Sequence, residues 1–191
     1  MTTHAGDPLI QPRLTRYATF RLSANLGKLS EKERAMIPLL IEAAQQMDEI
    51  FWLQAYGEKK DLLASIPDPE TRRLVEINYG PWDRLGNNQP LISGVGPKPD
   101  GANFYPPDMT REEFEETLAL TPPENARRLK SLYTLVRRNI QGELISVPYS
   151  EAFRKHLQVA ASRLLEAAEL AEDSGLERFL KMRAKALLDD D

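Results

Sequence analysis

The sequence predicts an α+β fold that is predominantly helical, with a small antiparallel sheet and a long ordered loop. Apolar residues recur at helical spacing over much of the chain, and two β-prone runs, 132–138 and 144–149, flank the turn-forming sequence NIQG. The segment 76–107, rich in proline, glycine and aromatic residues, has neither period; we call it the aromatic loop. At 191 residues, one domain over 1–191 is expected.

The N-terminal part predicts an arm followed by a strand. Residues 1–13 mix glycine, proline and polar residues without a period, which is typical of a loose arm. From 18 to 26 the even positions are apolar and the residues between them are mainly polar. This alternation predicts a half-buried strand, and we expect it to join the antiparallel sheet.

A long amphipathic helix follows over about 31–56. Ser30 and Glu33 have the spacing of a capping box, and apolar residues then recur every three or four positions until Gly57. Pro38 lies inside this helix. Because proline lacks an amide donor and clashes with the preceding turn, the sequence predicts a kink or a two-piece helix there.

Shorter helices flank the aromatic loop. A turn or two of helix is expected within 58–66, and Asp68 followed by Pro69 predicts an N-cap and the first residue of a helix that ends near Ile77. Within the loop, 91–93 is the one stretch that could pair as a strand. After it, the capping box of Thr110 and Glu113 predicts a helix to about Leu120, and residues 124–130 could add a further turn.

The C-terminal third predicts a hairpin of strands and a hairpin of helices. Gly142 can supply the positive φ that the turn between the two β-prone runs requires. Ser150 is expected to cap a helix to about Glu172, and Ser174 with Glu177 forms a further capping box for a second helix. Because their connection is short, the two helices should pack antiparallel.

Composition excludes several classes of function. With 25 basic and 29 acidic residues the net charge is -4, so the chain lacks the basic surface that nucleic-acid binding requires. No segment approaches the roughly 20 apolar residues of a membrane span, and 1–13 lacks the apolar core of a signal peptide. We therefore expect a soluble, cytoplasmic protein without membrane or nucleic-acid partners; a removed secretory leader stays open.

Residues that could hold a metal are scarce. The chain has no cysteine and two histidines, His4 in the arm and His156 on a predicted helix, and it lacks an H-E-x-x-H motif. His156 lies beside the apolar face of its predicted helix, which favours a histidine at the edge of the core over a metal ligand. No metal-ligating residue is assigned.

Signals for nucleotide binding or catalysis are equally weak. The glycine-rich run 94–101, GVGPKPDG, lacks the G-K-[ST] ending of a phosphate-binding loop, and its prolines remove amide donors. There is no G-x-S-x-G motif for a nucleophilic serine. A carboxylate pair among Asp83, Asp100 and Asp108 stays open, although such residues usually form turns and caps. No catalytic residue and no cofactor are assigned to this chain.

The aromatic loop holds the candidate recognition residues. Large rigid aromatic side chains provide contact area at little entropic cost, so Tyr79 and Trp82 could bind a substrate or a partner; alternatively, they plug the core beneath the loop. Pro81 and Asp83 favour a fixed pose, and we expect Trp82 partly exposed at the mouth of a groove. The substrate- or partner-binding candidates are Asn78, Tyr79, Trp82, Asp83, Asn103 and Tyr105.

Five runs in the same order carry a family resemblance: FWLQAYG (51–57), EINYGPWDRL (76–85), GVGPKPDGANFYPPDMTREEFE (94–115), LYTLVRR (132–138) and VPYSEAF (147–153). Through them the chain resembles the N-terminal portion of bacterial zinc peptidases related to dipeptidyl peptidase III. The resemblance covers most of the chain from about Tyr17 onward.

The resemblance implies a substrate-cleft or scaffold module of a metallopeptidase. In that family the zinc ligands and the general-base glutamate lie later in a longer polypeptide, and no position here matches them. Zinc is therefore expected in the complete protein, and the implied partners are a peptide substrate and the metal-bearing remainder of the same polypeptide. The alternative from another class is a stand-alone helical interaction module with an aromatic docking loop.

Overall fold

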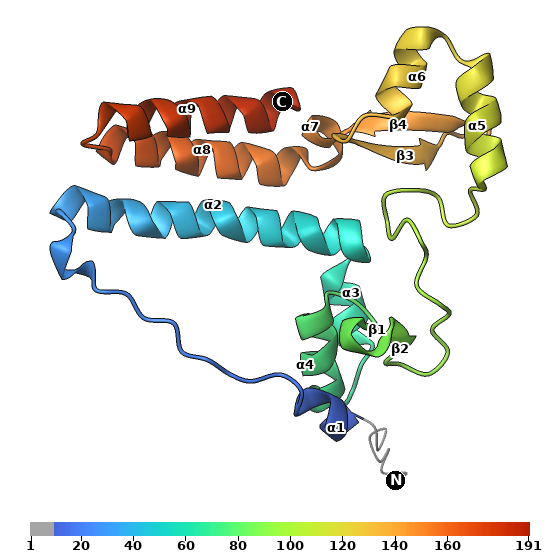
Figure 1. Cartoon of the computed structure of the whole chain (residues 1–191), viewed down its shortest axis with the longest axis horizontal. Helices are drawn as coiled ribbons and strands as arrows, with labels where there is room; N and C mark the ends of the chain where they lie inside the picture. Colours follow the sequence, from blue (N-terminus) through green and yellow to red (C-terminus); the bar gives the residue numbers. More distant parts are fainter. Residues whose placement is uncertain (1–9) are drawn as a thin grey trace. The chain divides into compact units, whose positions relative to one another are not determined.

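The computed structural model describes residues 10–191, which form two compact units (Figure 1). Among the described residues, the first unit comprises 10–24 and Phe51–Asn103, and the second comprises Asn25–Ile50 and Phe104–Asp191. The structure is mostly helical with two small antiparallel sheets, which confirms the predicted fold class. No helix in the described part of the chain has the length and apolar character needed to cross a membrane.

The first unit is a cluster of short helices with a two-stranded sheet. Its elements are α1 (Ile10–Leu14), α3 (Lys59–Ala64), α4 (Pro69–Asn78), β1 (Trp82–Asp83), the 3-10 helix η2 (Arg84–Gly86) and β2 (Gln89–Pro90). Its core contains Ile10, Trp52, Leu74, Val75 and Leu91, all buried. Trp52 comes from the end of α2 (Glu31–Ala55), whose residues up to Ile50 belong to the second unit.

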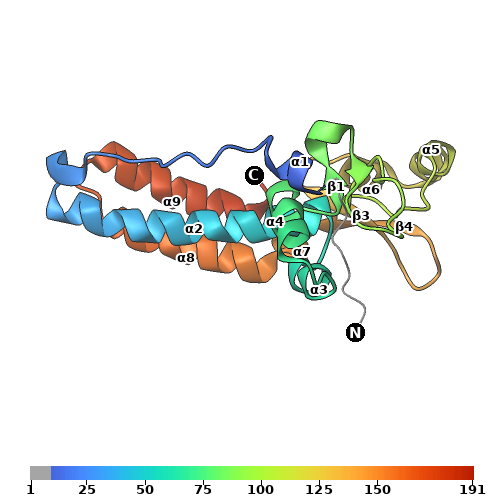
Figure 2. The same cartoon turned by 90° about the horizontal axis from the view of Figure 1, so that it is seen from below.

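In the second unit, three helices pack around one apolar cluster. Helices α8 (Arg154–Leu170) and α9 (Ser174–Asp189) lie side by side and antiparallel in both views (Figures 1 and 2), as the short connection predicts. Met36 of α2 packs with Ala167, Ala168 and Leu180. Arg163 of α8 also forms an ion pair of 2.6 Å with Glu42 of α2.

The other part of the second unit is a β-hairpin covered by two helices. Strands β3 (Thr134–Arg138) and β4 (Leu144–Pro148) pair antiparallel with Val136 opposite Ser146, which confirms the predicted hairpin. Gly142 in the turn has φ of 86°, the positive value that the turn requires. Helices α5 (Arg111–Leu120) and α6 (Pro123–Leu129) supply Phe114 and Leu129 to the core that Val136 completes.

Arg138 ties α5 and the preceding loop to β3. Its guanidinium donates to both carboxylate oxygens of Glu113 at 2.7 and 2.9 Å and to Asp108 at 2.9 Å. These hydrogen bonds hold the pKa of both carboxyl groups below their usual values and raise the pKa of Arg138. The cluster therefore favours its charged state and fixes one end of the hairpin.

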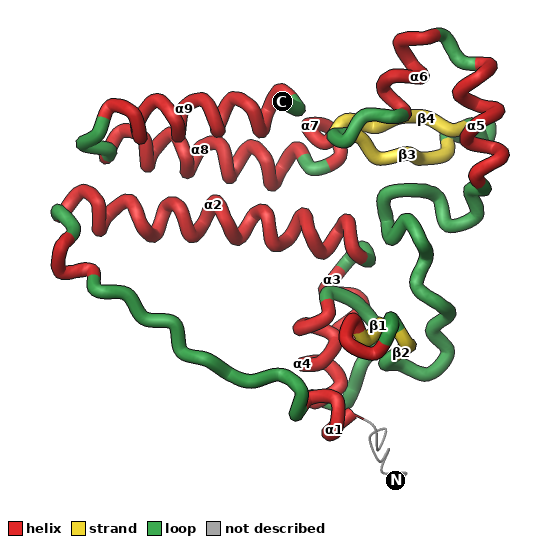
Figure 3. The backbone as a smooth tube through the Cα atoms, viewed as in Figure 1, coloured by secondary structure: helices red, strands yellow, loops and turns green. Residues whose placement is uncertain are grey.

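The predicted strand over 18–26 is wrong. Residues 18–25 form neither helix nor strand, and the 3-10 helix η1 (Leu26–Lys28) follows them (Figure 3). Phe20 and Leu22 are 82% and 87% exposed. The alternation is real, but within residues 10–191 the segment has no strand beside it, and an unpaired strand is not stable in water.

The loose arm predicted over 1–13 is wrong for residues 10–13, because these lie in α1; residues 1–9 lie outside the described part. Ile10 is only 2% exposed and packs with the α4 residues Leu74 and Val75. A helix of five residues is too short to show a period in the sequence, so its position depends on these tertiary contacts.

Helix α2 is continuous through Pro38, which excludes the two-piece helix, while the kink stays a prediction. The capping box at its start is confirmed: the Glu33 amide donates to Ser30 Oγ at 3.1 Å, and the Ser30 amide donates to the Glu33 carboxylate at 2.7 Å. Met36 and Leu40, on either side of the proline, pack against α8 and α9, and this burial offsets the cost of the missing amide donor.

Three local predictions in the other segments are also corrected. The aromatic loop contains two short strands, β1 and β2, which precede 91–93 and pair with each other. Helix α9 is capped by Asp173, which accepts from the Leu176 amide at 2.7 Å, and Ser174 is its first residue. Ser150 lies inside the short helix α7 (Tyr149–Ala152), and its amide and hydroxyl both donate to Asp190. Asp173 thus takes the capping role predicted for Ser174, and Ser150 donates to the end of α9 instead of capping a helix.

Candidate functional site

The candidate site begins where helix α4 ends, at Tyr79. Asp68 caps the start of α4 by accepting from the Thr71 amide at 2.8 Å, as predicted. At the other end Tyr79 takes a left-handed conformation (φ 54°, ψ 39°), and the Gly80 amide donates to Val75 O at 3.1 Å. A non-glycine residue in this conformation costs about 1–2 kcal/mol, so other interactions must hold Tyr79 there.

Ring packing supplies those interactions. The Tyr79 ring meets Phe51 edge-on, with centroids 4.7 Å apart, and it lies 5.3 Å from the Trp52 ring. Such pairs contribute about 0.5–1.5 kcal/mol each beyond the burial of their surface. Tyr79 is partly buried against the core of the first unit, so packing accounts for its position.

Trp82 lies in the core of the first unit. Its side chain is 8% exposed, its ring centroid is 5.8 Å from that of Tyr56, and its Nε1 donates to Gly96 O at 2.9 Å. The expectation of a partly exposed Trp82 at a groove is therefore wrong. A Cβ on Gly80 would lie 3.3 Å from the indole, so glycine at that position lets the ring pack closely. Through its hydrogen bond to Gly96, Trp82 holds the later part of the aromatic loop against the core.

Asn78 satisfies three hydrogen bonds inside the fold. It is 5% exposed; its Nδ2 donates to Leu74 O at 2.8 Å, and its Oδ1 accepts from the Arg84 amide at 2.9 Å and from the Tyr17 hydroxyl at 3.2 Å. A buried amide with its groups paired in this way holds neighbouring segments in register. It joins the last turn of α4 to η2 and to the segment after α1.

Asp83 is a buried carboxylate that holds the N-terminal helix. It is 1% exposed, it caps η2 by accepting from the Leu85 amide at 3.1 Å, and its other oxygen lies 3.6 Å from Arg13 Nε and 3.5 Å from Arg16 Nη1. A Cβ on Gly86 would lie 2.6 Å from this oxygen, so only glycine fits beside it. Two cations compensate the buried charge, which favours an anchoring role over a free acid.

Asn103 and Tyr105 belong to different units. The Asn103 amide donates to Gln54 O at 2.9 Å and its Nδ2 donates to Leu53 O at 2.7 Å, which fastens the end of the aromatic loop to the last turns of α2. Tyr105, in the second unit, is 42% exposed. Burial raises the pKa of the Tyr149 hydroxyl, and Tyr105 adds to the increase. The structure thus brings together Asn78, Tyr79, Trp82 and Asp83, with Asn103 in the same unit.

Sequence reasoning missed the partners of this cluster. Arg13, Arg16 and Tyr17 come from residues that show no period, and the only signal was the spacing of the two arginines, one helical turn apart. Close to Tyr17 is a cavity of about 430 Å³ between α1 and α4, lined in part by Leu14, Arg73 and Ile77. Gln11 donates to Glu70 across the same pair of helices.

The described residues do not fit a metal centre. Within 10–191, no group of three or more histidine, cysteine or acidic side chains lies close enough together to hold an ion. His156 Nδ1 is 2.9 Å from Gln46 Oε1, which is the core-edge position predicted for it. His4 lies outside the described part. Of the three aspartates considered as a carboxylate pair, Asp83 and Asp108 lie in different units, each beside arginines.

Two solved structures match this chain in both fold and sequence. The structure of dipeptidyl-peptidase III from Corallococcus sp. strain EGB matches with a TM-score of 0.89 and 34% identity, over 96% of this chain and 35% of that chain. The structure of DPP III from Caldithrix abyssi matches with a TM-score of 0.88 and 37% identity, over 95% of this chain and 35% of that chain. These matches confirm the resemblance predicted from the sequence.

Comparison with sequences adds a further relative. Nudix hydrolase 3 from Arabidopsis thaliana is 25% identical over 246 residues, an alignment that spans 100% of this chain and 32% of the relative. No protein-family model matches the chain. The chain thus spans about a third of the length of each of these three relatives.

Proposed function

We propose that this chain is the N-terminal scaffold and substrate-cleft module of a zinc-dependent metallopeptidase of the dipeptidyl peptidase III kind. The observation that carries the proposal is the match in both fold and sequence to two bacterial dipeptidyl peptidases III over nearly the whole of this chain. Because the chain spans 35% of each solved relative, the proposal assigns peptide hydrolysis to the complete protein.

The geometry of the first unit supports the scaffold part of this role. Asn78, Trp82 and Asp83 are buried, and their polar groups bond to the protein itself. Residues that line a substrate cleft need accessible surface and polar groups aimed outward. We therefore propose that these three residues, with Tyr79, hold the aromatic loop in place, and that Tyr105, which is partly exposed, is the cleft-facing candidate of the set.

Zinc does not belong to this part of the protein in our proposal. The described residues offer no fitting donor set, so the metal and the general base are assigned to the remainder of the polypeptide. There zinc would supply an activated water for attack on a peptide bond. The contribution of this chain is to fold rigidly and to support the wall of the cleft.

Two measurements test the proposal. The isolated chain should hold no stoichiometric zinc after dialysis and release no dipeptides from peptide substrates; one tightly bound zinc per chain would contradict our assignment of the metal. The coding sequence downstream of Asp191 should continue into an H-E-x-x-H-like motif. If the full-length protein encoded by the gene lacks such a motif and binds another protein through the aromatic loop, it is instead the stand-alone interaction module.

A further inference from the structure

Helix α9 carries two apolar faces, and only one of them is used in the core. Leu180 and Ala184 are buried, and Leu180 packs with Met36 of α2 and with Ala167 and Ala168 of α8. Phe179 and Met182 are 60% and 64% exposed, and together with Ala186 they occupy positions i, i+3 and i+7 of the same helix. This spacing places the three side chains on one side of a helix. A second apolar face at helical spacing differs from the scattered exposed hydrophobic residues that are normal on a protein surface.

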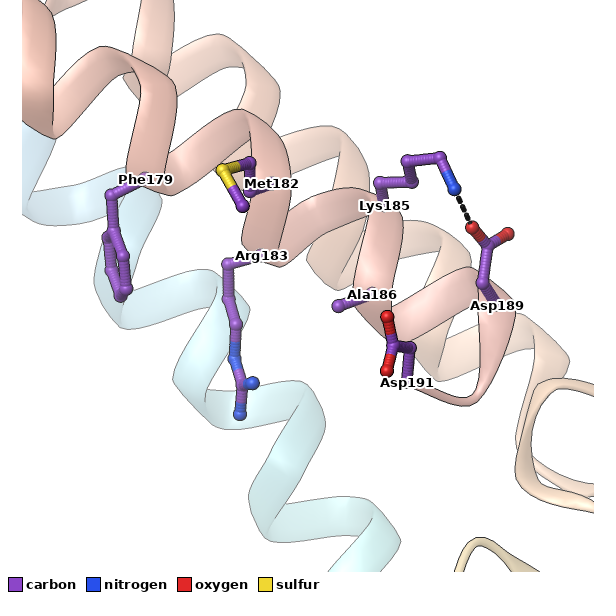
Figure 4. Close-up of a pocket in the computed structure, with 7 residues that line it drawn as sticks. All are labelled: Phe179, Met182, Arg183, Lys185, Ala186, Asp189 and Asp191. Carbon is purple, nitrogen blue, oxygen red and sulfur yellow. Dashed lines mark hydrogen bonds and ion pairs between the residues drawn. The ribbon is translucent and has the colours of Figure 1, made fainter.

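The second face borders a groove of about 320 Å³ (Figure 4). Its lining residues include Phe179, Met182, Arg183, Ala186 and Asp191, and all of them come from α9 or from the residues directly after it. Ligand pockets enclose most of the surface of a small molecule. A groove lined from one helix alone cannot do so, but it can receive a protein segment that brings its own opposing surface.

Arg183 places a positive charge in the middle of this face. It lies at position i+4 from Phe179, and its guanidinium points away from the ion pair of Lys185 with Asp189 (Figure 4). Within residues 10–191, no carboxylate lies at ion-pair distance from Arg183. Lys185 and Asp189, which also line the groove, pair with each other. The face therefore combines apolar surface with the Arg183 cation and, at its C-terminal end, the Asp191 carboxylate, and the complementary partner is an amphipathic segment with a carboxylate placed to meet Arg183.

We propose that the α9 groove binds an amphipathic helix from the part of the same polypeptide that lies outside these 191 residues. This inference rests on the proposed function, because the two solved relatives are about three times as long as this chain. The helix packs its apolar face on Phe179 and Met182, and one of its carboxylates pairs with Arg183. Two copies of this chain are a poorer match, because a two-fold contact centred on this face would bring Arg183 close to its own copy.

Thiol labelling tests the inference, because this sequence contains no cysteine. A Met182→Cys variant and a matched Lys181→Cys variant, on the opposite side of α9, are prepared in the isolated chain and in the natural full-length protein. Maleimide modification is followed at peptide level by mass spectrometry. Both thiols should react rapidly in the isolated chain, and in the full-length protein the thiol at 182 should be slowed by at least about tenfold relative to that at 181.

A charge reversal separates docking from general burial. In the full-length Met182→Cys protein, Arg183→Glu should restore labelling toward the rate of the isolated chain, whereas Lys181→Glu, on the opposite side of α9 from the groove, should leave the protection unchanged. If a variant does not fold, the rate of peroxide oxidation of Met182 in the unsubstituted proteins gives the same comparison. Met182 should oxidise more slowly in the full-length protein.

Several outcomes would overturn the inference. The first is an equal labelling rate of the thiol at 182 in the isolated chain and in the full-length protein. The second is equal protection of the thiols at 181 and 182, and the third is a gene that encodes no residues beyond these 191. Protection in the isolated chain that rises with its concentration would show that a second copy occupies the groove. Zinc content and peptidase activity are measured on the same full-length sample. An active zinc enzyme with an unprotected groove refutes only the docking, and a protected groove without peptidase activity refutes only the proposed function.

Discussion

Replacing Trp82 by alanine separates packing from recognition in the aromatic loop. The substitution removes an indole that is 8% exposed and leaves Gly96 O without its donor. Truncation of a buried aromatic side chain costs about 3–5 kcal/mol. Because Gly96 is exposed, water can replace the lost donor, so the hydrogen bond adds only about 0.5 kcal/mol. We expect the free energy of unfolding of the first unit to fall by about 3–5 kcal/mol.

The matched control is Trp82→Phe, which keeps most of the apolar ring and removes the N–H donor. Its cost should be about 1–2 kcal/mol. Urea unfolding is followed by the fluorescence of Trp52, which lies 2% exposed in the core of the same unit and is the only tryptophan left in either variant. An unchanged m-value would show that both variants unfold from the same compact state.

A loss below about 0.5 kcal/mol for Trp82→Ala would refute the packing argument, because ordinary surface substitutions cost that much. If the full-length protein then lost affinity for peptide while the unfolding free energy stayed constant, Trp82 would be a recognition residue after all.

Two further predictions concern the second unit. Leu180→Ala should lower the unfolding free energy by about 2–5 kcal/mol because Leu180 is 4% exposed. Leu165→Ala, at a side chain 44% exposed, should change the unfolding free energy by no more than about 0.5 kcal/mol. Thermal unfolding checks both variants, and a cost for Leu180→Ala no larger than that for Leu165→Ala would show that α9 does not share a core with α2. Arg138→Gln should reduce acid sensitivity. Arg138 lowers the pKa of Asp108 and of Glu113 from ordinary values of 3.8 and 4.5, so its stabilising effect is fully present above these values and disappears as the pH falls through and below them. Urea titrations at neutral and acidic pH test this, and a difference between the two proteins that stays constant with pH would contradict it.

Local signals predicted those parts of the fold that depend on neighbouring residues. The capping box of Ser30 and Glu33, the cap of α4 at Asp68 and the positive φ of Gly142 are all interactions within a few residues, and each is confirmed. The same rules misplaced the start of α9, because Asp173 and Ser174 are both good capping residues and only the backbone geometry decides between them.

Predictions that required a partner far along the chain were less successful. Residues 18–25 have the alternation of a strand but no neighbouring strand among the described residues, and α1 has no period yet is buried through Ile10. For the candidate site, the sequence identified the aromatic and polar residues of the first unit but not their orientation. Burial of Trp82 depends on Tyr56 and Gly96, whose proximity is a property of the folded loop.

The hydrogen bonds between Ser150 and Asp190 give the end of the chain a second role. The Ser150 amide donates to one carboxylate oxygen of Asp190 at 2.7 Å and its hydroxyl donates to the other at 2.5 Å, so residues forty positions apart close a ring around α8 and α9. Since the two helices already lie antiparallel, closing this ring costs little additional chain entropy. Fraying at the last turn of α9 breaks the ring first, which makes hydrogen exchange at the Ser150 amide a local reporter of that fraying.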